Sequence, residues 1–599
     1  MSKKKWAAAG AVLLSAVALA ACGKGGNESS GSGSHIKLPQ TYSAKGAAKG
    51  NDSTLYGAEV NDAPFKGITL AVLQDNAEDA DVYAPGGSDA LFKTDKNYKI
   101  IDGGLANQKL DRKKNTVTIT LRNNAKWSDG KPVIAKDVEY SYEIIGNKNT
   151  TSQQYSSDFN RIKGMAAYHA GKAKTISGIT YPDGQNGKKV VIQYSKLSPS
   201  MKYASNSFVW TTVSPYHHIK NIPIAKLASS NAVRKNPVFV GPYKLAKQVQ
   251  GESTTWVPNK YYYGPKPKIK HITLQVVSSS NAVSAFKSKK YDFALSQVPS
   301  SQYKNIKKAV KGSYSLVGTP APSYGYFGFN LGHFDTKTGK NVMDKGMKMS
   351  NKNLRQAMMY ALNLDATYKK LLNGVSWHAN TLIPPVFKKY YDASNPGFKY
   401  NVKKANKLLD QAGYKKKGKW RTQPNGKPLV IHFGVMQGSP VSEAIYQSEL
   451  QAWHKVGLNV KMTSGKPMEM NSFYSTLQAP KQNKIDIFNA AWSVSSEPTP
   501  TQIYGEDAPY NMGHFVTKKN TQLMNEMNNE KAWSSSYRVK KFKEWQKYMN
   551  DQAAYVADNF SYNYTPVNHR VKNFDLSNDS GPLTPGFWDK LELTSSNLK

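Results

Sequence analysis

Short runs in which apolar and polar residues alternate predict β-strands in the first quarter of the chain. Apolar residues occupy every second position from Ile68 to Val72, shortly after Phe65, and again from Val117 to Leu121. A period of two places these side chains on one face of a strand. We therefore predict that the folded part begins near Phe65 and that both runs form strands.

Apolar residues at three- and four-residue spacing predict helices further along the chain. One such stretch runs from Leu354 to Leu362 and another from Ala405 to Ala412, which is the spacing of one helix face. Gly413 follows the second stretch, and glycine favours the left-handed turn that ends a helix. Because strand and helix patterns interleave, the sequence predicts a mixed α/β (α+β) fold.

The amino-terminal segment has the pattern of a secretory signal. Three lysines at 3–5 precede an uncharged apolar run over residues 6–21, and Cys22 follows. The run is shorter than the roughly 20 residues that span a bilayer as a helix. We therefore predict a signal peptide at 1–21 that is cleaved before Cys22.

The tetrapeptide Leu-Ala-Ala-Cys at 19–22 resembles the lipobox of bacterial lipoproteins. This resemblance implies that the thiol of Cys22 carries diacylglycerol and that the protein is anchored by lipid to the extracytoplasmic face of the cell membrane, as on a Gram-positive surface. Cys22 is the single cysteine of the chain, so an intramolecular disulfide or a paired-cysteine metal site is excluded. The following residues are rich in Gly, Ser, Asn and Lys, so we predict a flexible tether at 22–50.

Length and charge change the picture in two ways. The 599 residues exceed what one core usually supports, so two or three domains are expected. The formal net charge of +41 is spread along the chain rather than gathered in one arm, so we predict no nucleic-acid partner. Anionic lipid headgroups, cell-wall polymers and plain solubility remain open as reasons for the charge.

Motifs that would carry catalysis are absent from the sequence. There is no Gly-x-x-x-x-Gly-Lys-Ser/Thr phosphate loop, no His-Glu-x-x-His zinc helix and no Gly-x-Ser-x-Gly elbow. His217 and His218 are adjacent, and on a strand such neighbours point to opposite faces, which argues against a shared metal. We predict a protein without catalytic activity, cofactor or metal.

Seven segments in order along the chain resemble the peptide/nickel family, or family 5, of extracytoplasmic solute-binding proteins. The most specific contains Lys-Trp-Ser-Asp-Gly-Lys-Pro-Val at 126–133, between a strand and a helix near Asp137, whose carboxylate can cap that helix. The segments are 119–141, 236–245, 258–264, 291–293, 326–330, 354–357 and 405–414. The segment at 258–264 has Tyr where the family has Trp.

The resemblance implies a two-lobed periplasmic-binding-protein-like fold with an extra subdomain in the first lobe. Lobe I would comprise a core at 51–92, 223–322 and 561–599 and the extra subdomain at 93–222, and lobe II would comprise 323–560. It also implies a monomer that holds an extended oligopeptide between the lobes, bonded through its backbone as an added strand. The partners implied are oligopeptides and the permease subunits of an ABC importer.

Residue by residue, the resemblance places peptide contacts mainly on a loop at 489–498. The expected contacts are Asn489, Ala491, Trp492, Ser493, Val494, Ser495 and Glu497 in this loop, Tyr324, Tyr326 and Gln297 near the hinge, and Asp81, Val82 and Tyr83 in lobe I. Each of them could instead be a packing residue, since aromatic side chains in strands are more often core than site.

The loop at 489–498 departs from enteric relatives, in which an Asp after the Trp holds the peptide's α-ammonium group. That place falls on Ser495 or Ser496, and the nearest acid is Glu497. Either Glu497 takes the role, or anchoring of the amino terminus is relaxed, as in relatives from lactic acid bacteria that take long peptides. An arginine that clamps the carboxyl end in some relatives has no clear counterpart before Asn489.

Two other functions remain open on the same fold. One is a receptor for a peptide pheromone, haem or chelated nickel, although no cluster of His and Cys marks a nickel site. The other is a basic surface adhesin, which would bind acidic polymers with a steep dependence on salt concentration.

Overall fold

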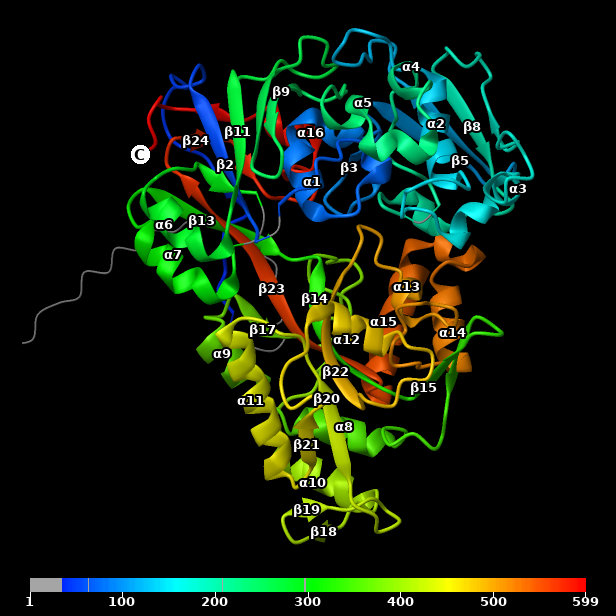
Figure 1. Ribbon diagram of the computed structural model, residues 1–599, viewed down its shortest axis with the longest axis vertical. Coiled ribbons are helices and arrows are strands. Elements are labelled where there is room, and N and C mark those ends of the chain that lie inside the picture. Colours follow the sequence, from blue (N-terminus) through cyan, green and yellow to red (C-terminus); the bar gives the residue numbers. More distant parts are fainter. Residues whose placement is uncertain (1–34, 63, 207, 296–297) are drawn as a thin grey trace, which may run out of the picture.

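The computed structural model describes residues 35–62, 64–206, 208–295 and 298–599. Figure 1 shows two lobes, one above the other, with a long strand running between them. The buried apolar side chains form three clusters: one spans lobe II and the part of lobe I around α6 and α7, one lies mainly in the extra subdomain, and one lies in the core of lobe I. The mixed two-lobed fold that the sequence predicted is confirmed.

The core of lobe I is a five-stranded mixed sheet with helices beside it. The strand order is β12 (Phe293–Ala294), β2 (Thr54–Val60), β11 (His271–Val277), β10 (Ser253–Pro258) and β9 (Tyr243–Val249). Strands β12, β2 and β11 run parallel, and β10 is antiparallel to both of its neighbours. The helices are α1 (Ala77–Tyr83), α6 (Ala282–Lys287), α7 (Tyr303–Ala309) and α16 (Pro585–Trp588).

The extra subdomain is a four-stranded antiparallel sheet covered by short helices. Its strands are β5 (Ala106–Asp111), β6 (Thr116–Leu121), β8 (Lys189–Gln193) and β7 (Ile179–Thr180), and its helices are α2 (Ala135–Gly146), α3 (Met165–His169), α4 (Tyr216–Ile219) and α5 (Asn231–Arg234). The indole of Trp127 donates to the carboxylate of Asp137, at 3.0 Å. The same carboxylate accepts the backbone N–H of Ile134 just before α2, so the motif at 126–141 serves as scaffold.

Lobe II is built around the remaining large sheet. Its strands are β14 (Ser323–Phe329), β22 (Ile487–Ser493), β20 (Val430–Gly434), β21 (Asn459–Met462) and β17 (Ser376–His378). Its helices are α8 (Lys352–Tyr360), α9 (Leu364–Leu371), α10 (Val402–Gln411), α11 (Pro440–Lys455), α12 (Met470–Leu477), α13 (Thr501–Tyr504), α14 (Lys518–Glu526) and α15 (Ser535–Gln552).

Short two-stranded pairs are β1 (Thr41–Tyr42) with β25 (Phe574–Asp575), β3 (Lys93–Thr94) with β4 (Ile100–Ile101), β15 (Gly332–Asp335) with β16 (Lys340–Met343), β18 (Lys416–Lys417) with β19 (Trp420–Arg421), and β24 (Val571–Lys572) with β26 (Glu592–Leu593).

Two strand connections join the lobes. Strand β23 (Tyr555–Asn568) pairs with β14 near its start and with β13 (Tyr314–Pro320) near its end, and it crosses the molecule diagonally in Figure 1. The chain crosses again between β13 and β14. The positions at which each lobe begins and ends along the chain stay a prediction.

Most segments with a periodic apolar pattern form the predicted element, and one does not. Strand β6 and helices α8 and α10 form where the pattern predicts them, and Gly413 ends α10 with φ +80°. The predicted strand at 68–72 is wrong, because Ala71–Leu73 is a 3₁₀ turn. The backbone N–H groups of Gly67 and Ile68 are taken by the carboxylate of Asp79 rather than by a neighbouring strand.

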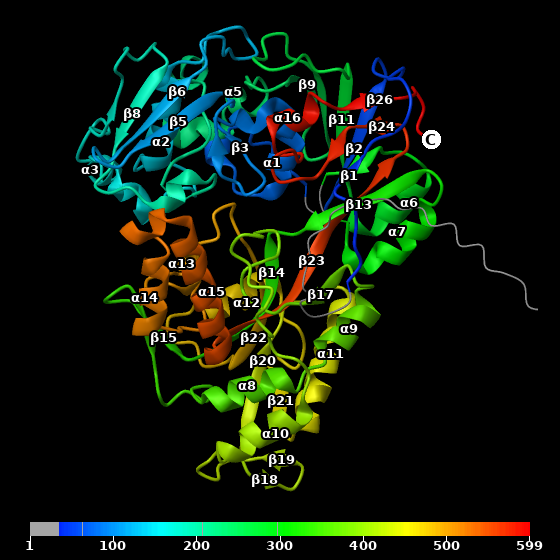
Figure 2. The ribbon, with the colours of Figure 1, turned by 180° about the vertical axis from the view of Figure 1, so that it is seen from behind.

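Residues 35–50, which the sequence assigned to a flexible tether, lie fixed along both lobes. The His35 ring stacks on Trp377 of lobe II at 4.4 Å between centroids, Gly318 of β13 donates to the carbonyl of Pro39, and β1 pairs with β25 of lobe I. Figure 2 shows this segment on the side of β13 and β17. The tether prediction is therefore wrong for 35–50, because partners distant in sequence satisfy this backbone.

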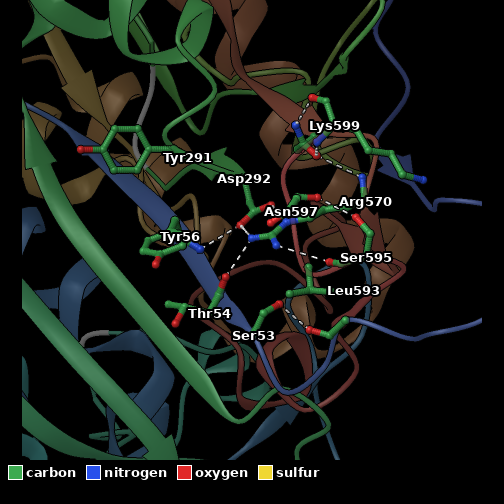
Figure 3. A network of polar contacts seen from close by, with 12 residues as sticks. Ser53, Thr54, Tyr56, Tyr291, Asp292, Arg570, Leu593, Ser595, Asn597 and Lys599 are labelled. Carbon is green, nitrogen blue, oxygen red and sulfur yellow. Dashed lines mark hydrogen bonds and ion pairs between the residues drawn. The ribbon is translucent and has the colours of Figure 1, made fainter.

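A buried ion pair fixes the carboxyl-terminal segment to lobe I. The guanidinium of Arg570 bonds both carboxylate oxygens of Asp292, each at 2.7 Å, and also the carbonyl of Thr54 at 2.8 Å. Figure 3 shows this guanidinium between β2 and the final residues, where it also reaches the carbonyl of Ser595. Strands β2, β12 and β23 are thereby joined to the chain end.

Candidate functional site

One edge of strand β22 has no strand partner over its second half, among the strands of the described residues. Strand β14 pairs with β22 over its whole length, whereas β20 pairs with it only at Ile487 and Phe488. Among the described strands, none pairs with the second edge from Asn489 onward. Ala491 and Ser493 are exposed there. Such an edge offers its backbone N–H and C=O groups to an added strand.

Alternation along β22 sends the predicted contact residues to two faces. Trp492 lies opposite Tyr324, on one face of the sheet, while Asn489 lies opposite Phe327 on the other. The ring of Trp492 is half-buried and rests against Tyr510, at 5.2 Å between centroids. Trp492 and Asn489 therefore do not converge on one point, although they share the strand that carries the open edge.

Tyr324 and Tyr326 lie in the core of lobe II. The hydroxyl of Tyr324 is 2.8 Å from that of Tyr504, and both Tyr324 and Tyr326 are buried. The hydroxyl of Tyr326 has no hydrogen-bond partner among the described residues. Their burial favours packing over ligand contact.

The side chain of Asn489 is held by a buried carboxylate. It donates to Asp558 at 2.7 Å, and Tyr368 donates to the same oxygen at 3.1 Å. Burial raises the pKa of Asp558, and burial together with the nearby Asp558 raises that of Glu449 on α11. Both carboxyl groups are buried inside the protein.

Glu497 is fully engaged inside lobe II. Its carboxylate pairs with the guanidinium of Arg538 on α15, and it also accepts the hydroxyl of Thr499 at 2.8 Å and the Thr499 N–H at 3.2 Å. Ser495 donates to the carbonyl of Glu497 at 3.0 Å. Because Arg538 occupies this carboxylate, the arrangement favours relaxed anchoring of an amino terminus over a role for Glu497 as its counter-ion.

The predicted contacts in lobe I belong mostly to its core. Val82 and Tyr83 are buried, and the Tyr83 hydroxyl donates to Gln248 at 2.7 Å. Asp81 is partly exposed on α1, and burial together with the charge of Glu78 raises its pKa to about 7. Asp81 is thus the member of this group that is open to contact. Gln297 and Cys22 lie outside the described residues.

The adjacent histidines lie on helix α4 rather than on a strand, so the premise of opposite strand faces was wrong. His217 contacts the carboxylate of Asp129 at 2.9 Å, and His218 contacts the carbonyl of Asn236 at 2.8 Å. Within the described ranges, no three His, Cys, Asp or Glu side chains are grouped as metal ligands. Over the same ranges, no helix combines the length and apolarity of a membrane span.

The extra subdomain and lobe II touch on the side of the molecule away from the hinge. Tyr390 donates its hydroxyl to that of Tyr203 at 3.0 Å. The ring of Trp533 contacts Arg112, whose guanidinium carbon is 4.8 Å from its centroid, and Lys202, whose Nζ is 4.7 Å away. Arg112 also pairs with Glu530. A hollow of about 780 Å³ opens beside this contact.

Sequence reasoning missed Arg538, Tyr203 and Tyr390. One signal was present for Arg538, because α15 buries it in line with Phe542, Trp545 and Met549. These positions follow the spacing of one helix face. A charged residue within an apolar stripe indicates a buried ion pair. No local pattern marks Tyr203.

Three comparisons relate the chain to known proteins. The profile described as bacterial extracellular solute-binding proteins, family 5 Middle, matches residues 101–513. The oligopeptide-binding protein OppA of Lactococcus lactis subsp. cremoris (strain SK11) is 39% identical over 98% of each chain. The oligopeptide-binding protein AppA of Bacillus subtilis (strain 168) is 25% identical over 79% of this chain and 78% of its own.

A solved structure is similar throughout. Lactococcal OppA, complexed with an endogenous peptide in the closed conformation, superimposes with a TM-score of 0.78 and 39% sequence identity. The match covers 90% of this chain and 99% of the lactococcal chain. The similarity therefore extends over both lobes.

Proposed function

Because the chain belongs to family 5 of the bacterial extracellular solute-binding proteins, we propose that it is the oligopeptide receptor of an ABC-type importer. It binds an oligopeptide between its lobes as a monomer and delivers it to the permease subunits. The lactococcal relatives named as oligopeptide-binding proteins support the ligand class.

The open edge of β22 is the single observation that carries the proposal. Ala491 and Ser493 are exposed on a strand whose other edge is already paired with β14. An extended peptide that adds to this edge is held by backbone hydrogen bonds, which every peptide offers regardless of its sequence. Peptides of many sequences then share one site.

The peptide ends are not held by charge in this proposal. The nearest acid in the loop at 489–498 is Glu497, and Arg538 already neutralises it inside lobe II. A peptide α-ammonium group that entered this place would have to displace a guanidinium from a buried pair. The ends of the peptide therefore stay hydrated, and binding extends to long peptides.

We assign the protein to the extracytoplasmic face of the membrane, attached through a lipid on Cys22. The lipobox at 19–22 supports this attachment. No catalytic role is proposed, since the family is one of solute-binding proteins.

Mass spectrometry of ligands that co-purify with the protein from its native host tests the function. The expected result is a mixture of oligopeptides of varied sequence, released on denaturation in amounts close to one per protein molecule. A haem, a metal chelate, a single peptide species or an acidic polymer in the same amount would contradict it.

A further inference from the structure

A tyrosine pair of the extra subdomain inserts into lobe II. Tyr203 belongs to the buried apolar cluster that contains the core of lobe II, although Met201, two residues before it, belongs to the cluster of the extra subdomain. Tyr98 lies beside it, since Ala204 donates to the carbonyl of Tyr98, and its ring meets Phe387 of lobe II at 5.8 Å between centroids. Tyr98 has φ +61°, a left-handed backbone that is unfavourable for a residue other than glycine. Such strain persists where the surroundings enforce it.

In lobe II, Tyr203 packs against the guanidinium of Arg538. The carbon Cζ of Arg538 lies 5.4 Å from the centroid of Tyr203 and 5.3 Å from that of Tyr390. Arg538 also donates to the hydroxyl of Tyr390 at 2.8 Å, and Tyr390 donates onward to Tyr203. At Tyr203 the extra subdomain thus contacts lobe II through one buried cation and one hydrogen-bond chain.

The same guanidinium holds the loop at 489–498. Its remaining nitrogens bond the carbonyl of Met527 at 2.9 Å, the hydroxyl of Thr499 at 3.1 Å and the carboxylate of Glu497. Burial alone would lower the pKa of Arg538, but the charge of Glu497 raises it above its ordinary value. Arg538 therefore stays charged while it contacts the loop and the other lobe together.

We propose that Arg538 is a positioning residue that couples the ligand loop at 489–498 to closure of the lobes. Glu497 and Tyr203 share this guanidinium, so a ligand that orders the loop favours the closed state, and the closed state retains the ligand. Coupling of this kind is reciprocal between the two contacts. The inference rests on the proposed function for its ligand, but the contact between the lobes can be tested without a ligand.

Opening the lobes withdraws Tyr203 from Arg538 and Tyr390. This loses a desolvated cation–π contact and one hydrogen bond. Tyr203→Ala removes both and Tyr203→Phe removes only the hydroxyl. The control is Tyr194→Phe, because the hydroxyl of Tyr194 donates to Phe208 inside the same subdomain and does not reach lobe II.

The first test follows release of the most abundant co-purified peptide, resynthesised with a fluorophore. Tyr203→Ala should raise its dissociation rate about tenfold or more, Tyr203→Phe about threefold, and Tyr194→Phe less than twofold. The association rate should change less than twofold, a split that simple loss of folded protein would not produce. Equal dissociation rates for Tyr203→Ala and the parent protein would overturn the coupling.

A double-mutant cycle tests the route through Arg538. In the Glu497→Gln protein, Tyr203→Ala should raise the dissociation rate by a factor at least three times smaller than in the parent. The reason is that the loop is then no longer joined to Arg538 by an ion pair. If the change in dissociation rate of the double variant equals the product of the two single changes within twofold, the route through Arg538 is overturned.

Small-angle X-ray scattering of ligand-free protein separates the coupling from the proposed function. Tyr203→Ala should increase the radius of gyration relative to the parent, and Tyr194→Phe should not. Equal radii for Tyr203→Ala and the parent overturn the contact. A parent that binds no peptide overturns only the proposed function.

Discussion

Arg570 and Asp292 form an ion pair that has no exposed side-chain surface, with Nε of Arg570 donating to Oδ1 of Asp292 at 2.7 Å. Arg570 follows the long strand β23, and Asp292 precedes β12 in the core of lobe I. The pair therefore joins the strand that crosses between the lobes to the parallel part of the lobe I sheet (Figure 3). Its bonds reach Thr54 of β2 and the carboxyl-terminal segment as well.

Removal of one partner of this pair should destabilise lobe I strongly. Asp292→Asn leaves the Arg570 guanidinium buried without its counter-charge, which costs about 3–5 kcal/mol of the free energy of unfolding. The matched control is Asp551→Asn, because Asp551 pairs with Lys352 on the surface and such pairs contribute about 0–1 kcal/mol. Urea denaturation followed by fluorescence measures both. Equal losses for the two variants would contradict a structural role for the buried pair.

Asp81 should make stability depend on pH near neutrality. Its pKa is raised from 3.8 to about 7 by burial and by Glu78, so the folded state holds a proton that the unfolded state has already lost between these values. Stability from this group is present below pH 4 and is lost as pH rises through 7. Asp81→Asn should match the parent at pH 4 and exceed it above pH 7, by at most roughly 4 kcal/mol.

Thermal unfolding of both proteins from pH 4 to pH 8 checks this expectation. Asp507→Asn, the same substitution at an exposed position, is measured beside it as the control. A difference for Asp81→Asn that is flat across the range would rule out a perturbed carboxyl group at this place.

Acetylation of the peptide's amino terminus should have little effect on affinity. Glu497 is paired with Arg538, so no free carboxylate of the loop at 489–498 awaits an α-ammonium group. The expected change is less than about tenfold, or roughly 1.4 kcal/mol. Calorimetry with the free and acetylated peptide, on the parent and on Glu497→Gln, measures it. A much larger loss in the parent that disappears in Glu497→Gln would show that Glu497 anchors the amino terminus.

Attachment to the membrane should depend on Cys22. Cys22→Ala removes the thiol that would carry the lipid, so the protein should appear in the medium or as an uncleaved precursor. Fractionation of cells that express each form, followed by immunoblotting, reports the outcome. Retention in the membrane at the mature size in the Cys22→Ala strain would contradict lipidation.

Local periodicity predicted some elements and failed where a distant partner decides the backbone. Strand β6 and helices α8 and α10 have apolar faces that the sequence repeats regularly. The run from Ile68 to Val72 has the same alternation, but the carboxylate of Asp79 takes the N–H of Ile68 and that of Gly67 before it. Residues 35–50 look like a linker in composition and are fixed by contacts with β13, β17 and β25.

The candidate site was predictable as a strand but not as a set of contacts. Resemblance placed it on 489–498, and the structure adds that pairing with β20 stops at Phe488 and leaves the edge open. Glu497 looked available because its partner, Arg538, lies 41 residues away, on helix α15. The contact of Tyr203 with Arg538 and Tyr390 depends on how the two lobes meet, which no local pattern encodes.

Peptide binding at the edge of β22 is tested most directly at Ala491. Val494 donates its N–H to the carbonyl of Pro322, just before β14. Because successive N–H groups of a strand point to alternate edges, the N–H of Ala491 points to the open edge. Ala491→Pro removes that N–H at an edge position that tolerates proline, whereas Ala491→Ser keeps it. Calorimetric titration with one co-purified peptide should show at least a tenfold loss of affinity for Ala491→Pro, with unchanged thermal stability, and less than a threefold change for Ala491→Ser. Equal affinity for Ala491→Pro and the parent would contradict peptide addition to this edge.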